Sequence, residues 1–490
     1  MTTAHAARCV FAALAAANAF SSPAAVPAHC TFVSVGGGWA GIYAAWRVAV
    51  DSKLQPASET CIFEASSRWG GRTFTVRSGA TAASGESRSD GKDLNIDIGA
   101  YRFAFEQRLP SDLIRGPLSL PTECYIPSCQ REPLDGNLVL HKLVDPSTNS
   151  SAGYGAALDA MLLALRRAGA HLFLQTELVA VRGGDGNKVL LEWRGGAHTV
   201  ATNVLLNLPR HAIHALDSSS VLFTEATPLA RSLYDCSRES AVANYTAEAS
   251  VKVYLLYPDA WWRTRLGLVE GELHSVSDPP LYIRYHDGPT RCNGNFGIDN
   301  QHKPQACAGA LLVQYAHTLE AGGGFYMRFR RNTSTPLTVL PYGDSPLPEL
   351  LHRKLLAVHT KALRAAGIAP GSLPTPKSAY LGFWPHDPTE LFHPAPDPLS
   401  FSTAHGPLPR CLGGLTSVQY SAATRKPVPG RSIFIANNDW WLEESEVDLI
   451  APYWAEVSLR VAERVLHDHV GLPQPGWLDA RYFRRSVLGI

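Results

Sequence analysis

The stretch FVSVGGGWAGIYAAWRV, residues 32–48, is followed closely by CIFEASSRWGGRTFTV, residues 61–76. An apolar run leads into Gly36-x-Gly38-x-x-Gly41, and an alanine-rich run typical of a helix follows. In such a strand–turn–helix the first glycine makes the tight turn and the second lets a pyrophosphate approach the backbone. The third lets the helix pack closely on the strand. The stretch predicts a dinucleotide site at a helix N-terminus, and the alternative is an ordinary tight turn.

A carboxylate stands where a dinucleotide site needs one. A second expected strand, residues 60–63, ends at Glu64, which lies 23 residues after Gly41. At this distance a carboxylate accepts hydrogen bonds from the adenosine ribose. Gly71 and Arg72 follow in a second glycine turn, which would bring backbone amides and a positive charge to the phosphates. The alternative for that turn is a Gly-Gly turn with surface arginines.

Bulk composition limits the partners. The chain has 490 residues, a formal net charge of +1 and 45% hydrophobic residues, which is enough for two or three domains with sizeable cores. This charge balance gives no reason to expect a nucleic acid partner. No apolar run is long enough to span a bilayer. The oligomeric state stays open, with a homodimer among the alternatives.

The first 28 residues differ from the rest. Arg8 precedes an apolar run, residues 9–20, and small residues follow, which is the layout of a secretory signal peptide. A plastid leader or a first helix are the alternatives. Three glycosylation sequons begin at Asn149, Asn244 and Asn332. Without Cys9, eight cysteines remain, and no cysteine–histidine cluster suggests a metal site. These features favour secretion through an oxidising compartment.

The close spacing of two cysteine pairs is consistent with small disulfide loops. These pairs are Cys124 with Cys129 and Cys292 with Cys307. Connectivity cannot be deduced from spacing alone, so the pairing of all eight cysteines stays open.

The order of expected elements predicts an α/β fold. We expect the residues around the glycine motifs to form a Rossmann-like dinucleotide-binding domain with a glycine-arginine (GR2) clamp, with an α+β substrate-binding domain inserted into it. The dinucleotide-binding domain is therefore discontinuous. The expected segments are a leader at 1–28, dinucleotide-binding parts at 29–110, 151–215 and 426–490, a short loop or helical insert at 111–150, and the substrate-binding domain at 216–425.

Residues 64–72, with the pattern E-x-x-x-R-x-G-G-R, resemble the corresponding segment of the flavin amine oxidase superfamily. The resemblance extends over nearly the whole chain after the leader and is nearest to the L-amino-acid oxidase branch. It implies FAD as the cofactor. Its substrates would be an amino acid or amine together with dioxygen.

Arg102 bears on the choice of substrate. The segment Asp97-Ile-Gly99-Ala100-Tyr101-Arg102 resembles a G-[AP]-M-R-[LF] turn of the L-amino-acid oxidases, whose arginine binds the substrate carboxylate. A guanidinium suits this role because two parallel N–H bonds orient a planar carboxylate. The alternative is a surface or phosphate-facing arginine, which would leave an amine as the substrate.

Lys252 and Trp454 complete the catalytic residues that the resemblance implies. Lys252 lies in an apolar strand, where the family places a lysine that holds a water near the flavin; a snorkelling edge-strand lysine is the alternative. Trp454 precedes the last long helix and would form a wall of the substrate site. Residues 437–439 are Asn-Asn-Asp where the family has Gly-Glu, and the segment after Phe103 is much shorter than in the L-amino-acid oxidases. No general base can be assigned.

The resemblance places cofactor contacts along the whole chain. The residues expected to bind FAD are Gly36, Gly38, Gly41, Glu64, Ala65, Arg68, Gly71, Arg72, Gly99, Ala100, Tyr101, Arg102, Leu178, Asn438, Asp439 and Ala455. The implied activity is deamination of L-amino acids to keto acids, with release of ammonia and hydrogen peroxide. The alternatives are an amine or polyamine oxidase of the same fold, and a secreted FAD-binding protein without turnover, which the Asn438-Asp439 segment motivates.

Overall fold

The computed structural model describes nine stretches of the chain. They are residues 25–78, 94–131, 138–243, 250–292, 307–316, 323–331, 335–384, 417–440 and 454–490. The leader expected at 1–28 lies almost entirely outside these residues. So do the sequons at Asn244 and Asn332, and Cys411.

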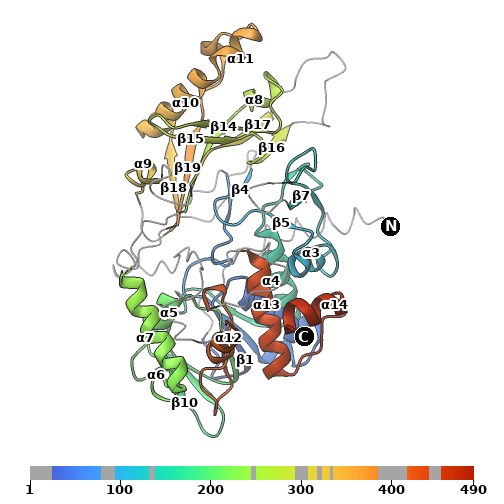
Figure 1. Cartoon of the computed structure of the whole chain (residues 1–490), viewed down its shortest axis with the longest axis vertical. Coiled ribbons are helices and arrows are strands. Elements are labelled where there is room, and N and C mark those ends of the chain that lie inside the picture. The colour runs from blue at the N-terminus through green and yellow to red at the C-terminus, as the bar shows by residue number, and fades with distance from the viewer. Residues whose placement is uncertain are drawn as a thin grey trace.

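A mostly parallel sheet carries the glycine motifs (Figure 1). Its central strand β1 (His29–Val35) runs parallel to β12 (His198–Leu206) on one side and to β2 (Thr60–Phe63) on the other. β20 (Ile433–Ile435) lies parallel beside β12, and β9 (His171–Phe173) lies parallel beside β2. The antiparallel strands β10 (Leu178–Gly183) and β11 (Val189–Trp193) extend the sheet beyond β12.

Helices cover both faces of this sheet because alternate strand residues are apolar on each face. Phe32, Ile62 and Leu205 share one core with helices α2 (Trp39–Trp46), α4 (Ala156–Ala168) and α13 (Ala455–Val465). Their neighbours Val33, Cys61 and Leu206 face a second core with α5 (Arg210–His214), α6 (Val221–Thr224) and α7 (Pro228–Ala243).

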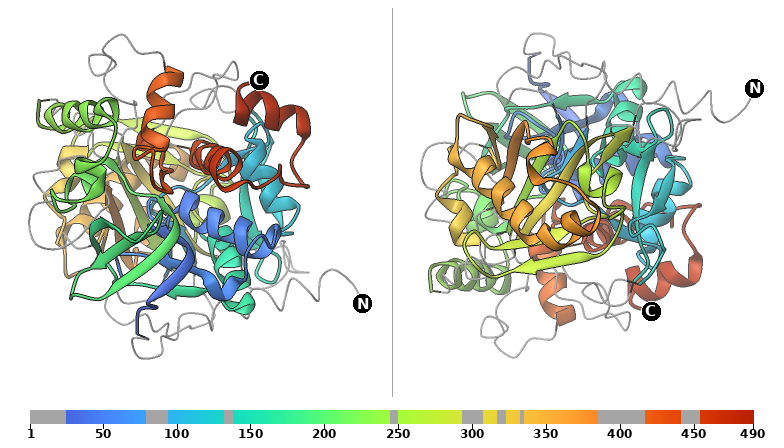
Figure 2. Two further views of the ribbon diagram at one scale, coloured as in Figure 1. Left: turned by 90° about the horizontal axis from the view of Figure 1, so that it is seen from below. Right: turned by 90° about the horizontal axis from the view of Figure 1, so that it is seen from above.

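A second, antiparallel sheet forms the other half of the molecule. Strand β13 (Ser250–Tyr257) pairs with β17 (Cys307–Ala316) and with β19 (Ser378–Trp384). The remaining strands are β14 (Glu272–Ser275), β15 (Leu281–Arg284), β16 (Thr290–Cys292) and β18 (Leu337–Pro341). Two helices, α10 (Pro346–Val358) and α11 (Thr360–Ala365), lie over this sheet (Figure 2).

Residues 103–151 contain short strands that the sequence analysis did not predict. Helix α3 (Arg108–Arg115) agrees with the expected short helix. A small sheet of β5 (Phe103–Ala104), β6 (Thr122–Cys124), β7 (Leu140–Asp145) and β8 (Ser150–Ser151) follows. The prolines and turn residues of this segment concealed the short strands, and β5 and β6 pair with a strand that is distant in sequence.

Shorter elements complete the described chain. They are β3 (Thr75–Arg77) paired with β4 (Asn95–Asp97), α8 (Trp261–Thr264), α9 (Gly324–Met327), α12 (Ser417–Arg425) and α14 (Ala480–Tyr482).

Three disulfides cross-link the described residues. The two small loops, Cys124–Cys129 and Cys292–Cys307, join cysteines that the sequence places close together. The third, Cys30–Cys61, joins neighbouring strands β1 and β2. Within the described stretches, no helix combines the length and apolar character needed to cross a membrane. No group of three or more potential metal ligands is found among the same residues.

Candidate functional site

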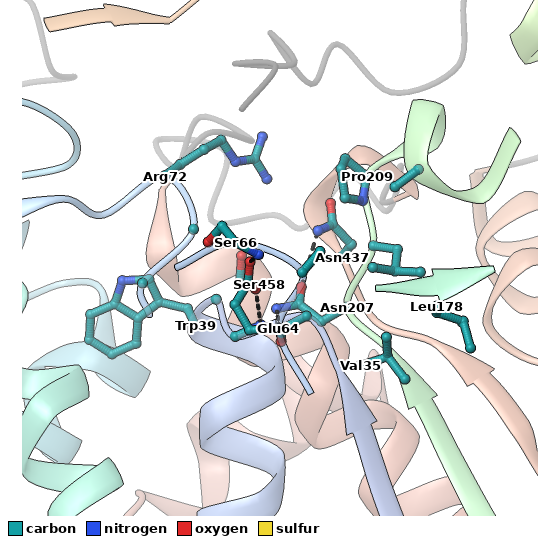
Figure 3. Close-up of a pocket in the computed structure, with 18 of the residues that line it drawn as sticks. Val35, Trp39, Glu64, Ser66, Arg72, Leu178, Asn207, Pro209, Asn437 and Ser458 are labelled. Atoms are coloured by element: carbon teal, nitrogen blue, oxygen red, sulfur yellow. Dashed lines mark hydrogen bonds between the residues drawn. The ribbon is translucent and has the colours of Figure 1, made fainter. Parts of the chain in front are cut away.

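A cavity of about 280 Å³ lies where β1, β2, β12 and β20 end (Figure 3). In sheets of this kind ligands bind outside the carboxyl ends of the strands, where connections leave in opposite directions. We call this space the main cavity. Its lining includes Gly36, Gly37, Gly38, Trp39, Glu64, Ala65, Ser66, Gly70, Gly71, Arg72, Ala100, Glu177, Leu178, Arg194, Asn207, Asn437, Asn438, Trp454, Ala455 and Ser458.

The first glycine turn brings backbone directly against the cavity. Gly36 has a φ of +98°, and a Cβ there would lie 2.3 Å from the carbonyl oxygen of Asn207. A Cβ on Gly38 would lie 3.0 Å from the Asn207 side chain. Helix α2 begins at the next residue, without a side-chain cap at Gly38. The turn therefore presents polar backbone and the positive end of a helix to the cavity.

Glu64 is held at the end of β2 by backbone hydrogen bonds. One carboxylate oxygen accepts from the Gly37 N–H at 2.7 Å, and the other accepts from the Ser66 N–H at 2.8 Å. The residue is only 7% exposed. These bonds fix the carboxylate between the first turn and the segment after β2, where Glu64 lines the main cavity.

The second glycine turn packs on the first. The Gly70 N–H donates to the Gly37 carbonyl at 2.7 Å, and a Cβ on Gly71 would lie 3.4 Å from the Gly38 Cα. Arg72 follows, lines the cavity and donates a hydrogen bond to the Asn438 side chain. A cation at this point suits a negatively charged ligand such as a pyrophosphate.

Asparagines form a wall that the sequence did not predict. The Asn437 side chain donates to Asn207 Oδ1 at 3.0 Å, and Asn207 in turn donates to the Gly36 carbonyl at 3.2 Å. Figure 3 shows both side chains beside the glycine turn. The available signal was an asparagine shortly after each of the apolar strands, Asn207 directly after β12 and Asn437 two residues after β20. Carboxyl ends of parallel strands meet at one edge, so these side chains come together.

Leu178 lies at the side of the cavity away from Arg72 in Figure 3. Beside it, Arg194 forms two hydrogen bonds of 2.6 and 2.7 Å with the Glu177 carboxylate. Arg194 and Glu177 both line the cavity. The pair is solvent-exposed on the arginine side, so its contribution to stability is small.

Lys252 occupies a buried position in the central strand of the second sheet. The residue is 2% exposed, and its ammonium donates to the carbonyls of Gly99 at 2.6 Å and Asp97 at 3.3 Å. It also lies 3.4 Å from the Tyr101 ring centroid. Burial lowers the pKa of Lys252 to about 7, although the charges of Asp287 and Asp97 act in the opposite direction. The alternative of a snorkelling edge-strand lysine is wrong, since β13 is flanked by two strands.

Arg102 lies beside this lysine. It is 6% exposed, with its guanidinium carbon 4.5 Å from the Tyr101 ring centroid and 4.8 Å from that of Tyr125. Tyr101 and Tyr125 belong to an apolar cluster against which Trp454 packs. Since Trp454 also lines the main cavity, the aromatic cluster borders one part of that cavity.

The structure brings most of the predicted catalytic and cofactor-binding residues together. Those that line the main cavity are Gly36, Gly38, Glu64, Ala65, Gly71, Arg72, Ala100, Leu178, Asn438, Trp454 and Ala455. Those outside its lining are Gly41, Arg68, Gly99, Tyr101, Arg102 and Lys252. The side chain of Asp439 lies outside the described part of the structure. The roles of all these residues stay predictions.

Sequence comparison finds one distant curated relative. Aplysianin-A of Aplysia kurodai is 22% identical over 247 residues, which make up 50% of this chain and 38% of that protein. The chain thus spans 38% of the length of this relative. No protein-family model matches the chain.

Structure comparison finds putrescine oxidase. A triple mutant of that enzyme, from a redesign of its cofactor binding, has a TM-score of 0.49 and 12% identity, and the match covers 90% of this chain and 99% of that one. The wild-type enzyme bound to putrescine has a TM-score of 0.47 and 13% identity, with 91% and 99% covered.

Proposed function

We propose that the chain binds FAD in the main cavity and oxidises the amino group of an L-amino acid. The products would be a keto acid, ammonia and hydrogen peroxide. The observation that carries the proposal is the meeting of two glycine turns and the Glu64 carboxylate around one cavity at the strand ends. This combination suits a dinucleotide with a ribose and a pyrophosphate, in a Rossmann-like arrangement.

The residues present fit such a cofactor. The glycines leave no room for side chains, because Cβ atoms at Gly36 and Gly37 would lie 2.3 and 2.4 Å from neighbouring atoms. Glu64 would accept hydrogen bonds from the ribose, and Arg72 would offset phosphate charge. When bound, a flavin supplies the acceptor for two electrons from the substrate and passes them to dioxygen. The chain itself supplies binding and orientation.

Substrate orientation is the task we assign to Arg102 and Trp454. A guanidinium would hold the carboxylate of an amino acid by paired hydrogen bonds and so fix the direction of the neighbouring Cα–H. This role of Arg102 is supported by its burial beside Tyr101, because the neighbouring residue Ala100 lines the main cavity. Trp454 would form a wall of the substrate space, and the Lys252 ammonium would hold a water close to the reacting atoms.

An amine or polyamine oxidase is the second candidate. The observation that favours it is that Arg102 does not line the main cavity. In that case Arg102 would serve only to fill the aromatic cluster, and a substrate without a carboxylate would bind. A flavoprotein without turnover is a third candidate, motivated by the Asn438-Asp439 segment, which stands where the family has Gly-Glu.

Anaerobic reduction of the bound flavin tests the choice of substrate. The purified full-length chain would be mixed with panels of amino acids and of amines, and loss of the flavin absorbance followed. Bleaching by amino acids is expected. Bleaching by amines alone would contradict the amino-acid proposal, and a yellow protein that no substrate bleaches would favour the third candidate.

Arg102→Ala and Lys252→Met test the two assigned side chains. Arg102→Ala should raise KM for an amino acid by about 30-fold or more, because a buried charge pair is lost. Lys252→Met should slow reoxidation by dioxygen, measured in stopped flow. Arg115→Ala is the matched control, since Arg115 also lies on an aromatic ring but is half-exposed. Unchanged kinetics in Arg102→Ala and Lys252→Met would contradict the roles assigned to these two side chains.

We further propose that the protein is secreted, with a plastid location as the alternative. Three disulfides among the described residues support passage through an oxidising compartment. Asn149, the one sequon within the described stretches, is exposed in the turn between β7 and β8. To test this, the full chain would be expressed in cells with a secretory pathway, and its product treated with a glycosidase. An unglycosylated product that is retained in the cells would contradict secretion.

A further inference from the structure

A cluster of buried charges lies between the second sheet and the turn that follows β4. Asp97, Arg102, Lys252, Arg284 and Asp287 are all buried there. A small second cavity of about 20 Å³ lies in this cluster and is lined in part by Asp97, Tyr254 and Asp287. Buried charges persist in proteins only when other charges or hydrogen bonds compensate them, so each of these groups affects the others.

Two residues of β13 converge on one carbonyl. Lys252 and Tyr254 are two positions apart and therefore share a face of the strand. The Lys252 ammonium and the Tyr254 hydroxyl lie 3.3 and 3.2 Å from the carbonyl oxygen of Asp97. The same hydroxyl lies 3.4 Å from Asp287 Oδ1. Asp287, which is 4% exposed, is thereby held next to the residues that contact Lys252.

The charge on Lys252 depends on its surroundings. Burial lowers its pKa to about 7, Asp287 and then Asp97 raise it, and Arg102 and Arg284 lower it. Burial also raises the pKa of Asp97, which disfavours its charged form. The other titratable groups around the ammonium are Tyr101, Tyr125, Tyr254, His286 and Tyr315, whose neutral forms contribute no net charge. Asp287 is thus the main source of negative charge for Lys252.

Lys252 is connected to the main cavity through the Asp97–Ala100 turn. Its ammonium holds the Gly99 carbonyl, while the Trp384 indole N–H donates to the Ile98 carbonyl at 2.7 Å. The next N–H, that of Ala100, donates to the Arg72 carbonyl at 3.0 Å. Ala100 and Arg72 both line the main cavity. Hydrogen bonds therefore connect the Lys252 ammonium, through Gly99 and Ala100, to the backbone of Arg72.

We propose that Asp287 is a positioning residue of the cofactor site. Its carboxylate keeps the Lys252 ammonium charged, and the charged lysine holds the Asp97–Ala100 turn, and with it Arg72, in the geometry that binds the dinucleotide. This inference rests on the proposed function, because it requires FAD in the main cavity. A charged ammonium binds carbonyl oxygens more tightly than a neutral amine does, so protonation of Lys252 strengthens its hydrogen bonds to the turn.

The test is the pH dependence of FAD affinity, which needs no turnover. FAD would be titrated into the flavin-free full-length chain between about pH 5.5 and about pH 9, a range chosen to bracket the lowered lysine pKa. Unbound flavin would be measured by fluorescence after ultrafiltration. For the wild type we expect affinity to fall about five-fold as pH rises through about 7, since one charge-assisted hydrogen bond weakens.

Asp287→Asn should move this midpoint to lower pH by about one unit, because the lysine loses its main counter-charge. Asp287→Glu should restore the wild-type midpoint. Asp259→Asn is the matched control: it removes a buried carboxylate from the same half of the molecule, where Asp259 accepts hydrogen bonds from the Thr264 hydroxyl and the Cys307 N–H. It should leave the midpoint unchanged.

The outcomes separate the two proposals. A wild-type chain that binds no FAD at any pH would overturn the proposed function and this inference with it. FAD binding whose midpoint is the same in Asp287→Asn and wild type, or shifts equally in Asp259→Asn, would overturn only the role of Asp287. If Asp287→Asn does not fold by circular dichroism, Tyr254→Phe decides, since it removes the hydroxyl that holds Asp287. An unshifted midpoint in that variant would also overturn the inference.

Discussion

Gly41 shows how closely backbone atoms approach one another beneath the main cavity. A Cβ at this position would lie 2.1 Å from the carbonyl oxygen of Gly36 and 2.8 Å from the Ser34 hydroxyl. Neither neighbour can withdraw easily, because Gly36 makes the turn and Ser34 lies in the central strand. The third glycine of the motif therefore sets the distance between α2 and β1, although it does not itself line the cavity.

Gly41→Ala should consequently displace α2 from the first turn. We expect a loss of about 1–3 kcal/mol in the free energy of unfolding, typical of overpacking, and weaker FAD binding. Urea unfolding and flavin titration would measure the two effects. Gly371→Ala is the matched control, since a Cβ there meets no atom within 4 Å. Equal stability of the two variants would contradict the tight contact.

At the scale of elements, a buried ion pair joins the two helices that border the main cavity. Arg47, one residue beyond α2, donates to Glu463 of α13 at 2.6 Å, and the Tyr43 hydroxyl donates to the same oxygen at 2.7 Å. Burial and the Glu463 charge raise the pKa of Tyr43 well above its usual value. Both helices begin at the cavity, so this pair sets the relative position of two helix N-termini.

Glu463→Ala should leave the Arg47 guanidinium with less compensation in the core. The expected cost is about 3 kcal/mol in the free energy of unfolding, because one partner of a buried pair is removed. Glu192→Ala breaks the part-exposed Arg182–Glu192 pair and should change stability by less than about 1 kcal/mol. Denaturant midpoints of the two variants provide the measurement. A similarly small change in both variants would mean that Asp51, the other acidic partner of Arg47, compensates the arginine charge without Glu463.

At the scale of the whole molecule, buried histidines link stability to pH. His286 follows β15 and packs against Tyr125, which follows β6, with the ring centroids 4.9 Å apart; burial lowers the pKa of His286 to about 4. Unfolding would return this pKa to about 6.5, so the unfolded chain binds more protons below that value. The stability contributed by neutral His286 is complete above about pH 6.5 and is lost as pH falls through about 4. Burial also lowers the pKa of His141, in the same direction.

The melting temperature should therefore fall between about pH 6.5 and about pH 4, and His286→Phe should make that fall shallower. Phenylalanine matches the ring in size but cannot be protonated, so it removes this contribution and leaves that of His141. Calorimetry of both proteins across the range is the measurement. Parallel slopes for the variant and the wild type would show that His286 has no part in the acid response.

The amino-acid sequence by itself determined the elements around the glycine motifs and the position of Glu64. Strand, turn and helix there depend on residues that are neighbours in the chain, and periodicity shows them directly. The strands of the segment after Phe103 were missed, because their pairing partners are distant in sequence. For the same reason the sequence could indicate that Lys252 is buried but could not identify what it contacts.

Only the tertiary structure decided which residues meet. Asn207 and Asn437 follow different strands, yet their side chains share a hydrogen bond because β12 and β20 run parallel and end at one edge. Asp287 comes next to Lys252 because β15 and β13 both pair with β17. Contacts between distant segments depend on strand order and register, which no local pattern in the chain specifies.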